Sequence, residues 1–341
     1  MRAFAWPCLA LFSGLGLFAY TGAQDAWRSI PYGLPPAPES LVRALADPRS
    51  AARHALGQRL FLARELSLDQ SISCASCHQP EHGFASPKAF SPGVGGAFTL
   101  RNAPSLLNRG FGRHFMWDGS VSSLEEQVLL QIFNEREMAL PLEQALERLR
   151  GDATWQQAFA AEFEDGVTQD NLALALATFV RFEWLGDSPV DRFHQGDYAA
   201  LTELERIGMW TFEGRGRCWQ CHSGGNFSDE DFHNTGVGAS AGQAQEGRLA
   251  FTGNPADRGK FKTPSLRGVG LSAPYMHDGS LASLEDVVEF YRQGGRPNAD
   301  LDELLAPLEL SEREALGLVH FLKALSRPAP KGGPEPGQQD Q

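Results

Sequence analysis

Cysteine, strand-like alternation and basic charge are all scarce in this chain of 341 residues. Four of its five cysteines fall into two close pairs and the fifth, Cys8, lies near the N-terminus, so there is no disulfide scaffold. Apolar and polar residues hardly ever alternate with a period of two, which excludes a sheet-rich fold. With 42 acidic residues against 30 Lys and Arg, the net charge is -12. Because nucleic-acid binding needs a basic face, the sequence predicts no nucleic-acid partner.

Long apolar runs are also missing, apart from one at residues 9–20. Arg2 precedes this run, and the small residues 21–23 offer a cleavage site after Ala23. The pattern predicts a secretory signal peptide over residues 1–23 and a periplasmic mature protein, with an uncleaved anchor as the alternative. Since no other segment is apolar enough to cross a bilayer, no stable membrane insertion is expected after cleavage.

Two C-x-x-C-H strings use every cysteine of the expected mature chain: C-A-S-C-H at 74–78 and C-W-Q-C-H at 218–222. Two thiols on one turn can add to the vinyl groups of a haem, and the adjacent histidine then binds the iron. A zinc site or a thioredoxin-like dithiol is the alternative interpretation of such a string. Two strings in one chain favour two covalent c-type haems. The attaching residues would be Cys74, Cys77 and His78 for the first haem, and Cys218, Cys221 and His222 for the second.

Apolar residues recur with helical spacing through most of the chain. Residues 24–38 are rich in Pro and Gly and are expected to be extended, and the tail 328–341 is expected to be disordered. A capping box, Ser122-x-x-Glu125, predicts the start of one helix. The expected helices begin near Glu39 and include residues 51–62, 122–133, 142–149, 155–163, 171–184, 201–212, 284–291 and 310–325.

The second part of the chain repeats the first. A predicted helix precedes each string, and related blocks follow in the same order: R-N-A-P-S-L at 101–106 matches K-T-P-S-L at 262–266. A longer block, D-G-S-x-x-S-L-E, occurs at 118–125 and again at 278–285. The sequence therefore predicts an all-α fold of two tandem cytochrome c-like domains, each with one covalent haem. Their expected bounds are 39–190 and 191–327.

The chemistry of each haem depends on its sixth coordination position, because an open position binds peroxide and a closed one passes electrons. Tyr291 lies on the apolar stripe of its predicted helix, so it points toward the core, where a core aromatic and an iron ligand are both consistent with the pattern. The candidates for the second haem are Met276, His277 and Tyr291, and those for the first are His82, His114, Glu137 and Met138.

From residue 39 to residue 325 the strings and blocks resemble the bacterial di-haem cytochrome c peroxidase and MauG family. In the peroxidases a loop histidine closes the first haem of the resting enzyme, and the matching residue here is Val94, which cannot bind iron. In the peroxidases a methionine closes the second haem, where MauG-like members have a tyrosine, and the match is Tyr291. The resemblance therefore implies an open first haem, a second haem closed by Tyr291, and the MauG branch.

The resemblance also implies site residues around the first haem. Glu137 matches an acid that moves a proton between peroxide oxygens, and Gln127 matches a pocket glutamine. Trp117 matches a tryptophan that relays electrons between the haems. Each has a plain structural alternative, namely a surface charge, a polar helix position and a core aromatic. One calcium ion is implied between the domains, with the Asn102 side chain and the carbonyls of Ser272 and Pro274 as its oxygen ligands.

Two positions depart from the family pattern. Gln131 stands where both branches usually have a proline, six residues before the distal acid. Gly216 stands where MauG has a tryptophan, two residues before the second string, and Trp210 and Trp219 are possible substitutes or packing residues.

The function implied is a MauG-like enzyme that uses H₂O₂ to form a high-valent di-haem state and oxidise a residue of a partner protein, expected to be tryptophan. A di-haem cytochrome c peroxidase fed by a small redox protein is the first alternative. A non-catalytic electron carrier or haem sensor is the second, and it requires two closed, low-spin haems.

Overall fold

A computed structural model describes residues 30–326, and the predicted signal peptide 1–23 and tail 328–341 lie outside the described residues, as do residues 24–29 of the segment 24–38. The compact unit begins at Pro31. Within the described residues the α-helices are α1 (Glu39–Ala46), α2 (Ser50–Leu62), α3 (Cys74–Cys77), α4 (Leu124–Phe133), α5 (Leu142–Gly151), α6 (Ala153–Glu162), α7 (Gln169–Phe182), α8 (Pro189–His194), α9 (Glu203–Glu213), α10 (Leu249–Thr252), α11 (Leu284–Arg292) and α12 (Glu312–Ala324).

The fold is mostly helical, as predicted, but it also contains a two-stranded antiparallel sheet that the sequence did not indicate. Strands β1 (Phe232–His233) and β2 (Phe261–Lys262) pair Phe232 with Lys262. Two residues are too few to show an alternating pattern. None of the helices within residues 30–326 combines the length and apolar character that a bilayer crossing requires.

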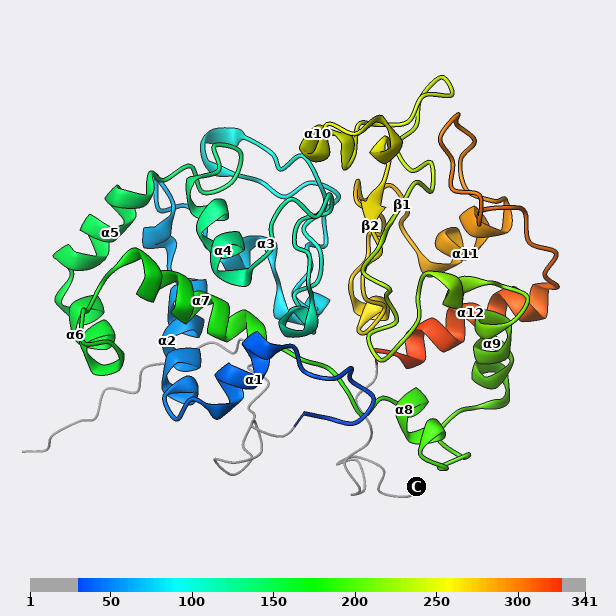
Figure 1. The fold of residues 1–341 in the computed structure, drawn as a ribbon, viewed down its shortest axis with the longest axis horizontal. Coiled ribbons are helices and arrows are strands. Elements are labelled where there is room, and N and C mark those ends of the chain that lie inside the picture. The colour runs from blue at the N-terminus through cyan, green and yellow to red at the C-terminus, as the bar shows by residue number, and fades with distance from the viewer. Residues whose placement is uncertain (1–29, 327–341) are drawn as a thin grey trace, which may run out of the picture. The chain divides into compact units, whose positions relative to one another are not determined.

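Buried apolar side chains form two separate clusters. The first joins α2, α4, α5, α6 and α7, and the second joins α9, α11 and α12. Figure 1 shows these two groups of helices, with the sheet beside the second. The exact bounds 39–190 and 191–327 stay a prediction, but two successive cores, the second of which includes Val190 of α8, are what two tandem units would produce.

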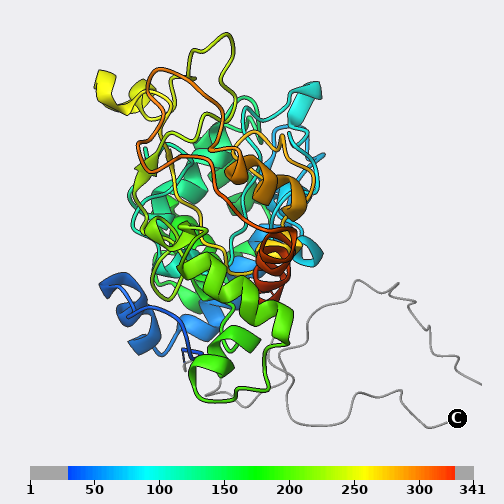
Figure 2. The ribbon, with the colours of Figure 1, turned by 90° about the vertical axis from the view of Figure 1, so that its right-hand side faces the viewer.

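The same helix crossing occurs in both clusters. A Cβ atom on Gly57 of α2 would lie 2.1 Å from the Ala175 carbonyl oxygen of α7, and one on Gly208 of α9 would lie 1.9 Å from the Gly317 carbonyl oxygen of α12. Glycine therefore allows each pair of helices to approach at backbone distance. Figure 2 shows α9 in green and α12 in red side by side.

Helix starts follow capping rules, with one difference from the prediction. Ser123, not Ser122, caps α4: its backbone is extended and its hydroxyl accepts from the Glu126 N–H. The matching residue of the repeat, Ser283, caps α11 with a full capping box. The predicted box at Ser122 was therefore wrong by one residue, and the alignment of the repeats points to the right serine.

Candidate haem sites

Each C-x-x-C-H histidine is oriented by a backbone carbonyl. The Nδ1 of His78 lies 2.9 Å from the carbonyl oxygen of Phe84, and the Nδ1 of His222 lies 2.9 Å from that of Phe227. Because a carbonyl only accepts, Nδ1 carries the proton and Nε2 keeps its lone pair, which is the arrangement of an iron-binding histidine. Burial lowers the pKa of both histidines, which favours the neutral ligand form.

The two phenylalanines that supply these carbonyls are held in the same way. Phe84 and Phe227 both have a left-handed backbone, with φ of 57° and 50°. The Phe84 ring packs edge-on against Phe61 and Phe179 of the α2–α7 crossing. The Phe227 ring packs in the same manner against Phe212 and Phe321 of the α9–α12 crossing. Each helix crossing thus holds the left-handed phenylalanine in place, and the carbonyl of that phenylalanine orients the histidine.

The four cysteines of the two strings form no disulfide with one another or with any other residue of the range 30–326. Burial raises the pKa of Cys74 and of Cys218 to about 12, so these thiols are neutral. A thioredoxin-like dithiol needs the opposite shift. Within residues 30–326 the one group of three potential metal ligands is Cys221, Asp229 and His233, and it lacks the fourth ligand of a structural zinc site.

A large cavity opens beside the second string. Its volume, including the open mouth, is about 1500 Å³. Apolar side chains form most of its wall, and both ring nitrogens of His277 are buried there without a partner among the described residues. A haem fits this cavity, since a haem is apolar over its faces and carries polar carboxylates at one edge. The residues relevant to haem binding in this wall are Cys218, Cys221, His222, Tyr291, Met276, His277 and Trp117.

Tyr291 of α11 therefore lies in the wall of the cavity that holds His222, as the helix pattern predicted. Burial raises the pKa of Tyr291, so its phenol is neutral without a metal. Met276 and His277, the other sequence candidates, line the same cavity. Iron ligation by Tyr291 stays a prediction.

The distal residues expected beside the first string come from α4 and the turn after it. The Nδ2 of Asn134 donates to the carboxylate of Glu137 at 2.9 Å, and desolvation raises the pKa of Glu137 to about 7. Glu137 acts electrostatically on Cys74 and Cys77, so it lies near the first string. The Oε1 of Gln127 is buried and has no partner among the described residues.

The loop around Val94 is fastened to this turn. The N–H of Val94 donates to the Glu137 carbonyl at 2.9 Å, and a Cβ on Gly93 would lie 2.1 Å from the Arg136 carbonyl oxygen. Met138 is a core residue with 4% exposure. His114 packs its ring edge-on against Phe232 of β1.

Trp117 connects the two halves. Its Nε1 donates to the Asn102 carbonyl at 2.9 Å, and its own carbonyl accepts from the Lys262 N–H at 2.7 Å. Its ring lines the second cavity and meets His277 edge-on, with 6.3 Å between centroids. A role of Trp117 as a relay between two haems stays a prediction.

The structure provides less information on the predicted calcium ligands and on the tryptophans near the second string. The backbone N–H of Asn102 donates to the carbonyl of His277, three residues after Pro274, while its side-chain Nδ2 donates to Lys88. The calcium site with Ser272 and Pro274 stays a prediction. A Cβ on Gly216 would lie 2.7 Å from the Thr211 carbonyl oxygen, so this backbone does not admit a tryptophan there. Trp210 and Trp219 are exposed by 59% and 49%.

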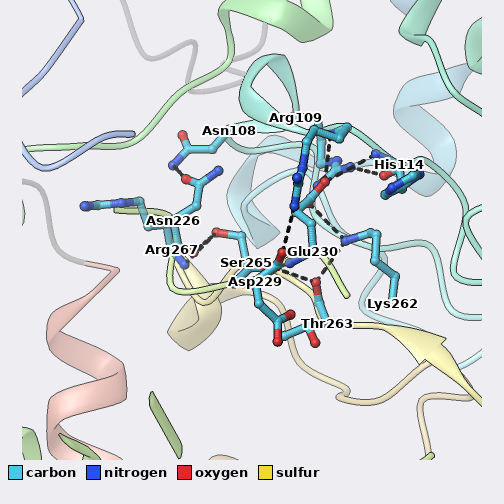
Figure 3. Close-up of polar contacts among 12 residues, drawn as sticks. Asn108, Arg109, His114, Asn226, Asp229, Glu230, Lys262, Thr263, Ser265 and Arg267 are labelled. Atoms are coloured by element: carbon cyan, nitrogen blue, oxygen red, sulfur yellow. Dashed lines mark hydrogen bonds and ion pairs between the residues drawn. The ribbon is translucent and has the colours of Figure 1, made fainter. Parts of the chain in front are cut away.

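Sequence reasoning missed a buried ion cluster between the halves (Figure 3). The carboxylate of Glu230 accepts from Arg109 Nη1 at 3.0 Å, from Lys262 Nζ at 3.3 Å, and from the backbone N–H groups of Arg113 and His114. These positive groups lower the pKa of Glu230 to about 2 despite its burial. Arg109 and Lys262 lie 121 and 32 residues from Glu230 along the chain, so no local pattern shows the cluster.

Two helical cores with matching histidine sites are the arrangement expected of a di-haem c-type cytochrome. A family model described as di-haem cytochrome c peroxidase matches residues 51–199. The methylamine utilization protein MauG of Methylorubrum extorquens is 37% identical over 290 residues, covering 84% of this chain and 82% of that protein. The cytochrome c551 peroxidase of Nitrosomonas europaea is 33% identical, covering 83% and 82%.

Among solved structures, a MauG-like protein associated with microbial copper homeostasis superposes with a TM-score of 0.77 at 31% identity, covering 91% of this chain and 95% of the other. The chain therefore belongs to the di-haem cytochrome c peroxidase and MauG family. It is a peroxide-dependent oxidoreductase, and membership implies two c-type haems.

Proposed function

We propose that this protein is a MauG-type enzyme that uses H₂O₂ to oxidise a residue, a tryptophan, of a partner protein. The observation that carries this proposal is the position of Tyr291 in the wall of the cavity that holds His222. A phenolate oxygen favours oxidised iron, whereas a thioether favours reduced iron. A second site with a tyrosine is suited to storing oxidising equivalents.

The two haems would be held by the cysteines of the two strings, and their iron would be bound by His78 at the first site and by His222 and Tyr291 at the second. When bound, the haems supply the redox chemistry that cleaves peroxide and withdraws electrons from the partner. Val94 offers no ligand to the first haem, which leaves that site accessible to peroxide.

Glu137 and Gln127 handle the protons of peroxide. The ionised carboxylate of Glu137 can take a proton from one peroxide oxygen and return it to the other, and its pKa near 7 suits both steps. The unpartnered Oε1 of Gln127 can accept the remaining O–H. Both side chains therefore orient peroxide and keep its protons inside the pocket.

Trp117 provides the electronic connection between the sites, because its indole N–H donates to the Asn102 carbonyl on one side and its backbone carbonyl accepts from the Lys262 N–H on the other. Exposed Trp219, inside the second string, offers an exit to the surface. The proposal also includes a periplasmic location, a cleaved signal peptide over residues 1–23, and one Ca²⁺ held by Asn102, Ser272 and Pro274.

A peroxidase fed by a small redox protein is the second candidate, because Met276 lines the same cavity as Tyr291 and would give a second haem of higher potential. Relatives named as cytochrome-c peroxidases, such as IdrP2 of Denitromonas iodatirespirans at 34% identity, are nearly as similar as MauG.

The electron paramagnetic resonance spectrum of the ferric holoprotein distinguishes these proposals. We expect one high-spin and one low-spin haem, and the low-spin signal should change in Tyr291→Met. Tyr275→Phe is the matched control, since Tyr275 lines the same cavity but donates to the Val269 carbonyl. An unchanged low-spin signal in Tyr291→Met contradicts tyrosine ligation, and two low-spin haems would favour an electron carrier.

Peroxide assays complete the test. Mass spectrometry should detect an oxidised tryptophan in the partner, for which the product of a neighbouring gene is the first choice. Rapid oxidation of reduced cytochrome c with no modified partner would instead support the peroxidase.

A further inference from the structure

The polar side chains of the distal pocket form one chain of contacts. Gln127 and Gln131 lie one turn apart on α4, so their amides project from the same face. The Nε2 of Gln127 lies 3.1 Å from the sulfur of Met116, and Gln131 lies between Gln127 and Glu137. The order along the chain of contacts is therefore Met116, Gln127, Gln131 and Glu137.

The orientation of the Gln131 amide depends on the proton of Glu137. With its nitrogen toward Glu137, the amide donates to Oε1 at 2.8 Å and also to Oε2, while its oxygen accepts from Gln127 Nε2 at 2.5 Å. This orientation suits an ionised carboxylate, which only accepts.

In the opposite orientation the amide oxygen of Gln131 faces the carboxyl group, and its nitrogen lies 3.5 Å from the Met116 sulfur. This contact between the Gln131 oxygen and the carboxyl group is favourable only when Glu137 carries a proton and donates it to that oxygen. The Gln131 nitrogen then faces the Gln127 nitrogen, so Gln127 must turn as well and present its oxygen.

We propose that Gln131 is a positioning residue for Glu137, and that the amides of Gln131 and Gln127 rotate together when Glu137 gains or loses its proton. The inference deepens the proposed function, because it concerns the acid that handles the protons of peroxide. Glu137 keeps a hydrogen-bonding partner in both protonation states and therefore stays in place.

The rotation also changes which atom of the Gln127 amide, oxygen or nitrogen, lies at the end of the amide that has no hydrogen-bonding partner. With Glu137 ionised, this end is the buried Oε1, an acceptor. Once Glu137 has taken a proton, the end becomes an N–H donor, which stabilises negative charge on a ligand oxygen. No bond other than the O–H bond of Glu137 forms or breaks. A proline at position 131 would have no side-chain group for either contact.

No charged side chain contributes to the raised pKa of Glu137, so its polar partners are the neighbouring amides. Desolvation is the cause of its raised pKa, and the adjacent Glu135 and Arg136 are exposed. Cys74 and Cys77, from the first string, interact with it electrostatically and become uncharged thioethers once haem is attached.

Infrared difference spectra of the ferric holoprotein between about pH 5 and pH 9 test the proposal without turnover. We expect a carboxyl band and a glutamine amide band that change with one midpoint near the pKa of Glu137. In Gln131→Met the ionised form loses a charge-assisted donor, so the carboxyl midpoint should rise by about one pH unit and the amide band should no longer follow it.

Gln144→Met, at an exposed position of α5, is the matched control and should behave as the native protein. Glu137→Gln assigns the carboxyl band by removing it. Gln131→Asn keeps an amide but shortens it, and the same upward shift is expected there, which covers the case in which Gln131→Met does not fold.

An unshifted midpoint in both Gln131 variants, or an amide band that does not follow the carboxyl band in the native protein, overturns the inference. The proposed function fails separately, if the native protein oxidises no partner residue while the Gln131 shift is still observed.

Discussion

At the residue scale, the same side-chain arrangement is built twice, and the two copies differ where the chemistry differs. His78 and His222 are oriented in the same way, because each donates its Nδ1–H to a backbone carbonyl, that of Phe84 or Phe227. The distal sides are unlike, because Glu137 and two glutamines occur near the first string whereas Tyr291 lies in the cavity beside the second. The asymmetry expected from Val94 and Tyr291 is thus accompanied by a cluster of two glutamines and a glutamate near the first string.

Replacing Glu137 with Gln should slow the reaction with peroxide by a factor of roughly 10² to 10⁴, the usual contribution of a positioned acid-base group. In the native protein the rate should rise as pH increases through about 7, because the ionised carboxylate takes the proton and burial sets its pKa there. Stopped-flow absorption after mixing with peroxide measures both effects.

Glu135→Gln is the control, since this exposed neighbour should leave rate and pH profile unchanged. A Glu137→Gln variant that keeps the native pH profile would show that another group is the base.

At the scale of elements, the repeated helix crossing explains why two short strings become two rigid sites. Gly57 and Gly208 let α2 meet α7 and α9 meet α12 at backbone distance. The phenylalanines that hold the histidine-supporting carbonyls pack against these crossings. A substitution that displaces the helices of either crossing should therefore also displace the histidine, because Phe84 or Phe227 contacts both.

Gly57→Val and Gly208→Val should each destabilise the holoprotein by at least about 2 kcal/mol, because a side chain there overlaps the carbonyl of the facing helix. Chemical denaturation followed by circular dichroism measures the loss. Gly151→Ala at the end of α5, where an added Cβ meets nothing within 4 Å, should change stability by less than about 1 kcal/mol. Equal stabilities of all three variants would mean that the crossings do not support the fold.

Most of the helices were predictable from the sequence, because the spacing of apolar residues that indicates a helix is a local pattern. The periodicity that placed Tyr291 on the inner face of residues 284–291 is the pattern of α11 in the structure. The two-residue strands were not predictable, since they are too short to carry a period. The contact between Gln131 and Glu137 was hidden as well, because it depends on the turn after α4 and not on helical spacing.

At the scale of the whole molecule, buried polar contacts join the two halves beside Trp117. Asn108 donates to Asn226 at 3.0 Å, and Glu230 receives donors from Arg109 in one half and from Lys262 in the other. Lys262 also donates its backbone N–H to Trp117. The ion cluster therefore helps to fix the Trp117 segment, which we propose as the relay between the two haem sites.

The last prediction concerns the acid sensitivity of this junction. Since the pKa of Glu230 falls from 4.5 to about 2 on folding, its ionised form contributes stability above pH 4.5, and this stability is lost as pH falls toward 2. Glu230→Gln should cost roughly 3 kcal/mol at pH 7, because Arg109 and Lys262 keep their buried charges without a counterion.

The same variant should differ less and less from the native protein as pH is lowered from about 4.5 to 2, as measured by denaturant titration at each pH. Glu143→Gln, which removes an exposed partner of Arg150, is the control and should cost less than about 1 kcal/mol at every pH. If Glu230→Gln and Glu143→Gln cost the same at pH 7, the halves are held together by their apolar contacts, and the position of Trp117 does not depend on the ion cluster.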